Sequence, residues 1–345
     1  MIAKRYIFWL YMGYLLLAAS PSKGEENTQY QIERAAYFLT SDPQKAESIL
    51  TALAQSALSK DNDYIEYHYL LSLAALLQQK QGLAKRSFES MFLRVDSDAF
   101  LLKRFDILLN IGVWLRREGN YLQSEQVLLC ALKEADTTTK EMKALNSLGS
   151  VSRHFSSDSS EQKYFRKALE LAKQVDNKKA IAIATNNVGV MELELERVTE
   201  AKKLFKLAFS SAQVAGYESV ELSAGINLLF SLVLLNDALL YQRVLPRVEQ
   251  LVNKYSASPR GIFFEWVQAL AWTKFNKLKL SIDKRDYLKR RFGQIEDTAL
   301  QRLLVNYAAA QLNIDVTMVN YETHLNRSAI TQVEPWLKIA LECGY

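Results

Sequence analysis

Apolar residues recur along most of the chain at the spacing of amphipathic helices. Val188, Met191, Leu195 and Val198 follow one another at intervals of three or four residues, which places them on one face of an α-helix. Residues 191–196 alternate as a strand would, but the wider spacing around them is helical. The chain has 12 Gly and 5 Pro among 345 residues, too few for the many turns of a β-sandwich or barrel. The pattern therefore predicts an all-α fold.

An internal repeat runs through the predicted helices. Gly112, Gly149 and Gly189 are separated by 37 and 40 residues. A large apolar marker recurs at intervals of 37 to 40 residues, at Leu50, Phe88, Leu128, Phe165, Phe205 and Leu245. Small residues such as Ala84 and Ala201 precede this marker by four positions. Two markers that move in step indicate stacked helical hairpins, in which small residues let two helices approach closely.

This pattern resembles the tetratricopeptide repeat (TPR) family, whose hairpins carry a Leu-Gly step in the first helix and Ala, an aromatic residue and Ala in the second. The resemblance covers residues 28–256, which divide into six hairpins, and the period exceeds the family's usual value of about 34 residues. It implies a right-handed superhelical solenoid of antiparallel hairpins. It also implies a concave groove, lined by the first helices, that binds peptides or protein segments.

Residues 257–345 are predicted to be helical but do not follow the repeat. Residues 261–275 are apolar on nearly every side, with Phe263, Trp266 and Trp272, as expected of a buried helix. We expect this region to cap the solenoid, because a terminal repeat must cover an exposed core. The alternative is an aromatic surface for docking or for a homodimer.

The first 22 residues have the organisation of a secretory signal peptide. Lys4 and Arg5 precede a 14-residue apolar run, residues 6–19, and small residues follow it. A membrane-spanning helix needs about 20 apolar residues, so this run is short for an anchor. We therefore expect cleavage near Ser22 and a periplasmic or secreted protein. The alternative is an inner-membrane anchor formed by residues 6–19.

The charge of the chain limits its partners. The formal net charge is +5 and falls to +3 without Lys4 and Arg5, which is too little to predict a nucleic-acid partner. A basic run near the C-terminus contains Lys274, Lys277, Lys279, Lys284, Arg285, Lys289, Arg290 and Arg291. Because Asp283 and Asp286 interrupt it, we interpret the run as a solvated helix face. The alternative is attraction to an anionic membrane surface or cell-wall polymer.

The residue types needed for catalysis or for cofactors form no recognisable motif. His68, His154 and His324 have no second His or Cys at metal-binding spacing, and no nucleophile elbow, phosphate-binding loop or dinucleotide fingerprint occurs. We therefore expect no catalytic residue, no metal and no cofactor. Cys130 and Cys343 lie in distant parts of the predicted array, so we do not expect an intramolecular bridge. The alternative is a helical-toroid hydrolase or carbohydrate-active envelope protein, which would need carboxylates converging in a pocket.

The resemblance also suggests where a partner binds. The candidate residues, which face or border the groove in this family's geometry, are Asn110, Arg116, Arg117, Asn146, Arg153, His154, Asn186, Asn187 and Asn227. A carboxamide both donates and accepts, so it suits a peptide backbone, and arginine suits a carboxylate. This predicts an extended, partly acidic peptide across the third to sixth hairpins. The alternative is that the asparagines bond one hairpin to the next.

The favoured function is an exported protein- or peptide-binding module rather than an enzyme. Exported arrays of this kind resemble the periplasmic input regions of bacterial signalling proteins, which suggests a membrane-bound sensor kinase or diguanylate cyclase as the partner. The other version is a scaffold that gathers enzymes of the cell envelope.

Overall fold

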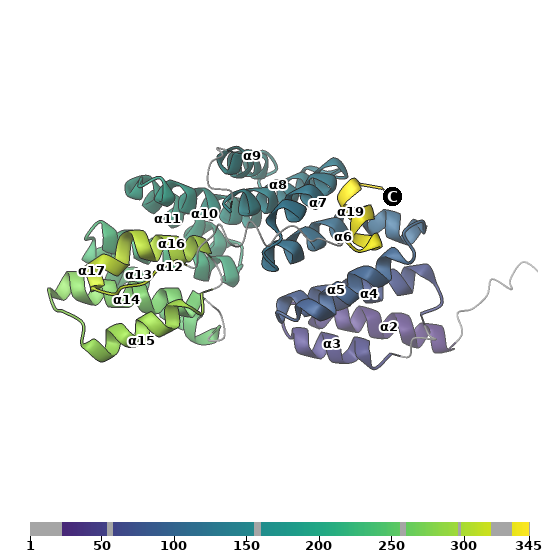
Figure 1. Ribbon diagram of the computed structural model, residues 1–345, viewed down its shortest axis with the longest axis horizontal. Helices are drawn as coiled ribbons and strands as arrows, with labels where there is room; N and C mark the ends of the chain where they lie inside the picture. The colour runs from purple at the N-terminus through teal and green to yellow at the C-terminus, as the bar shows by residue number, and fades with distance from the viewer. Residues whose placement is uncertain are drawn as a thin grey trace, which may run out of the picture. The chain divides into compact units, whose positions relative to one another are not determined.

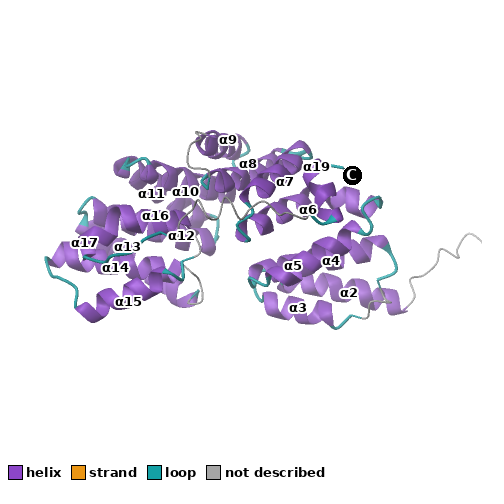
Figure 2. Ribbon diagram, viewed as in Figure 1, coloured by secondary structure: helices purple, strands orange, loops and turns teal. Residues whose placement is uncertain are grey.

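The computed structural model describes residues 23–53, 58–154, 160–255, 260–295, 298–318 and 333–344, so the expected signal peptide lies outside it. The regular elements of these residues are helices, and no strand occurs among them (Figures 1 and 2). The predicted all-α fold is confirmed. Neither cysteine is free in the structure, so the expectation of unbridged thiols is wrong.

The chain divides into two compact units, one formed by Met1–Trp114 with Val333–Tyr345 and the other by Leu115–Gln332. The helices of the first unit are α2 (Lys23–Phe38), α3 (Pro43–Thr51), α4 (Asp61–Leu77), α5 (Gln81–Phe92), most of α6 (Asp98–Arg117) and α19 (Pro335–Glu342). Those of the second unit are α7 (Tyr121–Lys133), α8 (Thr138–Ser152), α9 (Ser160–Gln174), α10 (Lys178–Glu194), α11 (Val198–Val214), α12 (Glu218–Leu234), α13 (Ala238–Lys254), α14 (Arg260–Asn276), α15 (Ile282–Phe292), α16 (Thr298–Leu304), η2 (Val305–Ala309) and α17 (Ala310–Leu312). Within each unit, consecutive helices pack as hairpins, such as α4 with α5 and α10 with α11.

Short side chains at the helix starts fix where the hairpins begin. The Asp42 side chain accepts from Lys45 N at 3.0 Å before Pro43, and Thr137 and Asn177 accept from the backbone three residues on. Such caps satisfy backbone N–H groups that have no partner inside the helix. Gly119, between α6 and α7, has φ of +79°, a conformation that glycine adopts without steric cost.

A returning C-terminal helix completes the first unit. The core of this unit is formed by α2 to α4, and its buried side chains include Ile32, Leu50, Leu70 and Leu71. α19 packs on α5 through Trp336, whose ring centroid lies 5.6 Å from that of Phe92 and 6.1 Å from that of Trp114. An ion pair between Lys85 and Glu334 adds a contact at 2.7 Å between residues 249 apart in sequence.

His68 is a buried titratable group of the first unit. Its ring contacts those of Tyr64 and Tyr67 edge to face, with ring centroids 4.5 and 4.9 Å away. Desolvation by burial, with a smaller contribution from the charge of Arg94, lowers the pKa of His68 from 6.5 to about 4. A neutral imidazole at this position is therefore part of the folded state at neutral pH.

Acidification should destabilise the protein through His68. Since the folded pKa is depressed, the unfolded chain takes up the proton first, and stability is lost as pH falls below about 6.5 towards 4. Between pH 7 and pH 5 the free energy of unfolding should fall by about 2 kcal/mol more in the wild type than in His68→Gln. Urea denaturation of both proteins at both pH values measures this difference, and carboxylates common to both cancel. Parallel pH profiles would contradict the assignment.

The glycines of the second unit lie where the two helices of a hairpin come closest. A Cβ built on Gly149 of α8 would lie 2.7 Å from the ring of Phe165 in α9. A Cβ on Gly189 of α10 would lie 2.6 Å from the ring of Phe205 in α11. No side chain larger than hydrogen fits at these separations without movement. The predicted close packing is confirmed at both positions.

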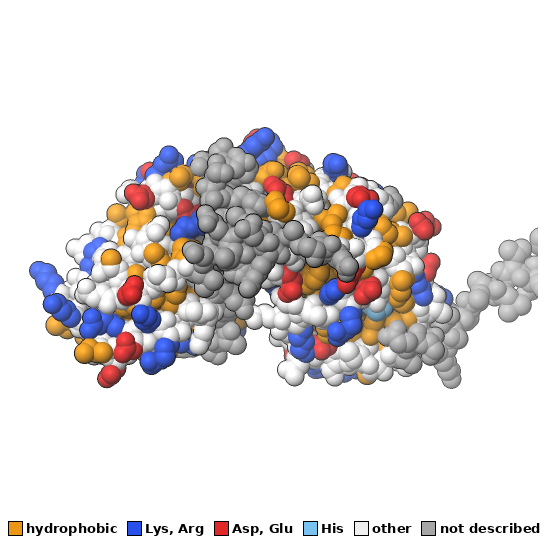
Figure 3. Space-filling view, in the orientation of Figure 1, with side chains coloured by type: hydrophobic (Ala, Val, Ile, Leu, Met, Phe, Trp, Pro, Cys, Tyr) orange, Lys and Arg blue, Asp and Glu red, His pale blue; other side chains and the backbone are white. Residues whose placement is uncertain are grey.

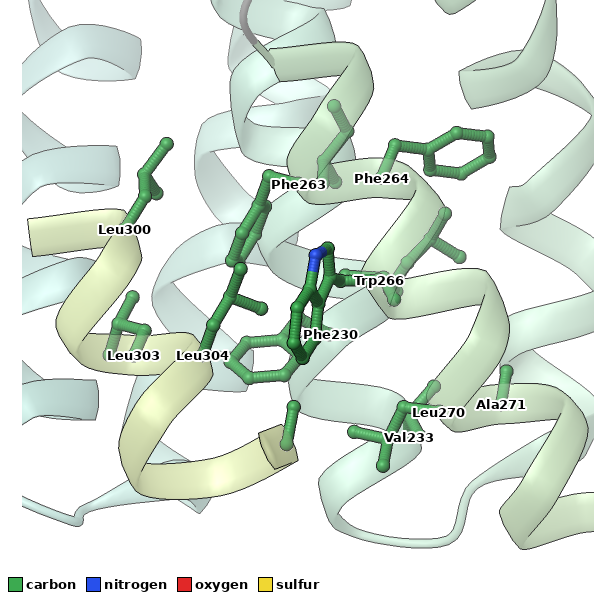
Figure 4. Close-up of a cluster of buried hydrophobic side chains, with 14 of the residues drawn as sticks. Phe230, Val233, Phe263, Phe264, Trp266, Leu270, Ala271, Leu300, Leu303 and Leu304 are labelled. Carbon is green, nitrogen blue, oxygen red and sulfur yellow. The ribbon is translucent and has the colours of Figure 1, made fainter. Parts of the chain in front are cut away.

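The last helices of the second unit share one core with α12 and α13. Figure 4 shows Trp266 and Phe263 of α14 together with Phe230 of α12 and Leu304 of α16. The three aromatic side chains, Trp266, Phe230 and Phe263, are fully buried. The expected burial of the apolar helix is therefore confirmed for the face of α14 that carries Trp266 and Phe263. Trp272 differs, because 53% of it is exposed.

Candidate functional site

The asparagines of the second unit join successive first helices. Asn187 Nδ2 of α10 donates to Asn146 Oδ1 of α8 at 2.7 Å. Asn227 Nδ2 of α12 donates to Asn186 Oδ1 of α10 at 3.0 Å. The two neighbours on α10 therefore reach in opposite directions, one to each adjacent hairpin. Both bonds link one hairpin to the next, as the structural alternative for these residues requires.

The two pairs differ in what they leave for a partner. Asn186 and Asn227 are buried, with 6% and 1% of their surfaces exposed. Asn146 and Asn187 are only half-buried. In the described residues, no bond occupies Nδ2 of Asn146 or Oδ1 of Asn187. The Asn146–Asn187 pair can therefore offer one donor and one acceptor to a peptide group.

A cavity lies beside this pair, between α8 and α10. Its volume is about 280 Å³, near the lower end of the range for ligand pockets. The lining residues are Thr139, Met142, Lys143, Asn146, Ala168, Asn177, Lys179, Ala180, Ile183 and Ala184. The four from α8 stand at positions i, i+3, i+4 and i+7, and so they share one face of the helix.

The lining combines an apolar floor with a polar rim that carries no acid. Met142 and Ile183, together with the three alanines, form the apolar part. Lys143 and Lys179 supply positive charge, and the Lys179 amine lies 4.0 Å from the ring centroid of Tyr217. Such a cavity can hold an apolar side chain and place its carboxylate neighbours against ammonium groups.

Of the sequence-predicted residues, Asn146 alone lines this cavity. The two lysines, Asn177 and the apolar floor were not predicted. For the part on α8, the sequence contained a signal. Thr139, Met142, Lys143 and Asn146 stand at helical spacing at the start of a first helix.

The predicted cationic residues near the ends of the first helices are engaged within the chain. Arg153 Nη2 lies 3.0 Å from Glu194 Oε1, and Arg302 Nη1 lies 3.6 Å from the same oxygen. Only 13% of the Arg153 side chain and 10% of the Glu194 side chain are exposed. The His154 ring stacks on Tyr121 with centroids 4.0 Å apart. The Arg153 charge is thus matched internally, which makes it a weak ligand for a partner.

The remaining predicted residues lie elsewhere. Asn110 belongs to the first unit, where it bonds with the side chain of Tyr69. Arg116 and Arg117 form the last turn of α6, and Arg116 is half-buried whereas Arg117 is exposed. None of the three lines the cavity between α8 and α10.

The first unit has its own hollow, of about 540 Å³, which sequence reasoning did not predict. Acidic residues contribute to it, namely Glu33, Asp63 and Glu66, beside Lys60 and Lys103. The Lys103 ammonium pairs with the Glu66 carboxylate. These carboxylates are exposed or half-buried.

The buried acids of the second unit are paired with arginines. Glu221 Oε1 and Oε2 each accept from Arg247 at 2.7 Å, and Glu192 lies 2.5 Å from Arg166 Nη2. Neither acid lines a cavity described above. No group of three or more His, Cys, Asp or Glu in the described part of the chain could hold a metal ion. No helix in that part combines the length and apolar character needed to cross a membrane.

Comparisons with known proteins agree with the fold. No protein-family model matches the sequence, and no curated protein matches it. Among solved structures, the Rap protein complexed with Competence and Sporulation Factor is similar, with a TM-score of 0.64, 13% identity and coverage of 92% of each chain. BtubC (BKLC) from P. vanneervenii has a TM-score of 0.45 and 16% identity, with 68% of this chain and 92% of that chain covered. The likeness to the Rap protein shows the fold, an all-α helical-repeat solenoid.

Proposed function

We propose that this protein is an exported TPR-like module that binds an extended segment of a partner protein or peptide at the cavity between α8 and α10. The single observation that carries the proposal is the position of this cavity beside the Asn146–Asn187 pair. A partner backbone would bond to the pair while one of its apolar side chains enters the cavity.

The chemistry of the lining defines the class of partner. A side chain such as Leu or Met matches the floor formed by Met142 and Ile183. Lys143 and Lys179 would attract a carboxylate next to that side chain. The partner segment therefore carries an apolar residue beside an acidic residue or beside its own C-terminal carboxylate. The complex of the similarly folded Rap protein with Competence and Sporulation Factor supports a binding role for this architecture.

The basic and apolar start of the sequence supports export. An exported binding module would act as a sensor or scaffold for an envelope signalling or assembly system. A membrane-bound sensor kinase or diguanylate cyclase is the partner we propose, because a chain without cytoplasmic access needs a separate protein to pass its signal inward.

Substitutions in the cavity should strongly reduce capture of this partner. The chain is purified from the periplasmic fraction, immobilised, and exposed to envelope extract, and the captured proteins are identified by mass spectrometry. Lys143→Glu and Ile183→Gln should each reduce the captured partner by more than about tenfold, as expected for residues near the centre of an interface.

Matched controls separate binding from folding. Outside the cavity, Lys173→Glu, at an exposed position of α9, makes the same charge change, and Val214→Gln, at an exposed position of α11, likewise replaces a β-branched apolar residue by Gln. Both should capture normally. Capture that persists in the two cavity variants, or that fails only where the melting temperature falls, would contradict the proposed site.

A further inference from the structure

The end of α14, the loop 277–281 and α15 form a strongly basic surface, here called the basic corner. Residues 274–291 contain eight Lys or Arg and two Asp. Its exposed cations are Lys277, Lys279, Lys284, Lys289 and Arg290. None of the five forms an ion pair with another described residue. Figure 3 shows Lys and Arg side chains gathered at the lower left of this view, where Figure 1 places α15.

Large apolar side chains are exposed within the same surface. Trp272 is 53% exposed, Leu278 is 49% exposed and Ile282 is 67% exposed. They belong to the end of α14, the loop and the first turn of α15 respectively. Side chains of this size gain free energy when they leave water. Cations interspersed with exposed apolar groups are typical of surfaces that lie in a membrane interface.

A shared hollow shows that the aromatic and basic groups lie together. It has a volume of about 390 Å³, and Trp272, Leu280, Lys279 and Lys284 line it with Glu265 and Gln268. The indole of α14 and two ammonium groups from the loop and α15 therefore border one open depression.

The acid in this hollow does not neutralise the lysines. Glu265 Oε1 accepts from Tyr287 Oη at 3.2 Å and lies 3.4 Å from Arg291 Nη2. Its charge is thus matched by a cation other than Lys279 or Lys284. Asp283 and Asp286 are the other acids of the corner, and both are exposed. The corner keeps an excess of exposed positive charge.

We propose that the basic corner docks on an anionic membrane surface. Lysine ammonium groups on flexible stems suit many mobile phosphate headgroups better than one fixed partner, because they act as adaptable point charges. Trp272 and Ile282 would enter the headgroup region, where an indole places its ring among acyl chains and its N–H towards water. Docking there would hold the binding cavity of the second unit close to a membrane-bound partner.

Vesicle binding tests this inference independently of the proposed partner. Mature protein is sedimented with vesicles of phosphatidylcholine alone or with added phosphatidylglycerol. It should bind the anionic vesicles only, and added salt should weaken the binding. The triple variant Lys277→Glu, Lys279→Glu and Lys284→Glu should bind about a hundredfold more weakly, since each basic residue near such a surface contributes strongly.

The control variant carries the same charge change elsewhere. Lys133, Lys173 and Lys206 are exposed lysines without an ion pair in the described residues, and their replacement by Glu should reduce binding far less. Trp272→Ala with Ile282→Ser should weaken binding even at raised salt, while capture at the α8–α10 cavity is unchanged in all these variants.

Three outcomes would overturn the inference. The first is equal binding to neutral and anionic vesicles. The second is an equal loss in the control and triple variants. The third is binding that the Trp272 and Ile282 substitutions leave intact and that soluble polyphosphate abolishes, because this identifies a site for polyanions rather than for a membrane.

Discussion

Gly149→Leu is expected to lower the free energy of unfolding by about 3 kcal/mol, the upper end of the usual cost of overpacking. The reason is local: the new Cβ would meet three atoms of the Phe165 ring at 2.7 to 2.9 Å. The ring is fully buried, so it has no free space into which to move. Chemical denaturation measures the loss.

Two further variants make this prediction specific. Gly82→Leu changes a helical glycine whose Cβ would meet only the end of Arg86, at 3.8 Å, and it should cost little. Adding Phe165→Ala to Gly149→Leu should recover part of the loss, because the leucine then occupies space that the ring has left. Equal stability of the Gly149 and Gly82 variants would contradict the packing described for this hairpin.

Glu194→Leu is expected to cost about 3 kcal/mol, since it removes the carboxylate that pairs with the largely buried Arg153 guanidinium. Arg302 of α16 loses the same partner. Denaturation at neutral pH measures the effect. Glu170→Leu, which removes the exposed pair with Lys167, is the control and should cost less than about 1 kcal/mol.

The double variant Arg153→Met with Glu194→Leu should be more stable than Glu194→Leu alone, because it also removes the buried charge that has lost the Glu194 carboxylate. If Glu194→Leu costs no more than Glu170→Leu, then Arg153 is not held internally, and it becomes a candidate ligand for a partner again.

Repeat spacing predicted the packing of the hairpins because that packing depends on residue size at fixed positions. Gly149 and Gly189 face Phe165 and Phe205, as two markers moving together implied. Gly225 of α12 has a similar contact, 2.7 Å from Val248. It lies 36 residues after Gly189, outside the 37- to 40-residue spacing, so the repeat pattern does not predict it.

The site was harder to predict, because hydrogen-bond partners lie one repeat away. The sequence showed that Asn146, Asn186, Asn187 and Asn227 occupy related positions. It did not show that neighbours on α10 bond in opposite directions. Arg153 is a candidate ligand on the sequence alone, because its partner Glu194 is 41 residues away and the pairing of the two is not visible there. Likewise, the return of α19 to α5 depends on contacts between distant residues.

Binding of a partner at the cavity between α8 and α10 underlies the proposed function. Its most direct test is photo-crosslinking with benzoylphenylalanine placed at Ile183, which lines the cavity, and separately at Val214, an apolar position of α11 that is 79% exposed. Each protein is irradiated in cells and its crosslinked products are identified. We expect one defined partner segment, with an apolar residue beside an acidic residue or a C-terminal carboxylate, to be crosslinked from position 183 and not from position 214. Equal crosslinking from both positions, or crosslinking from position 214 alone, would contradict it.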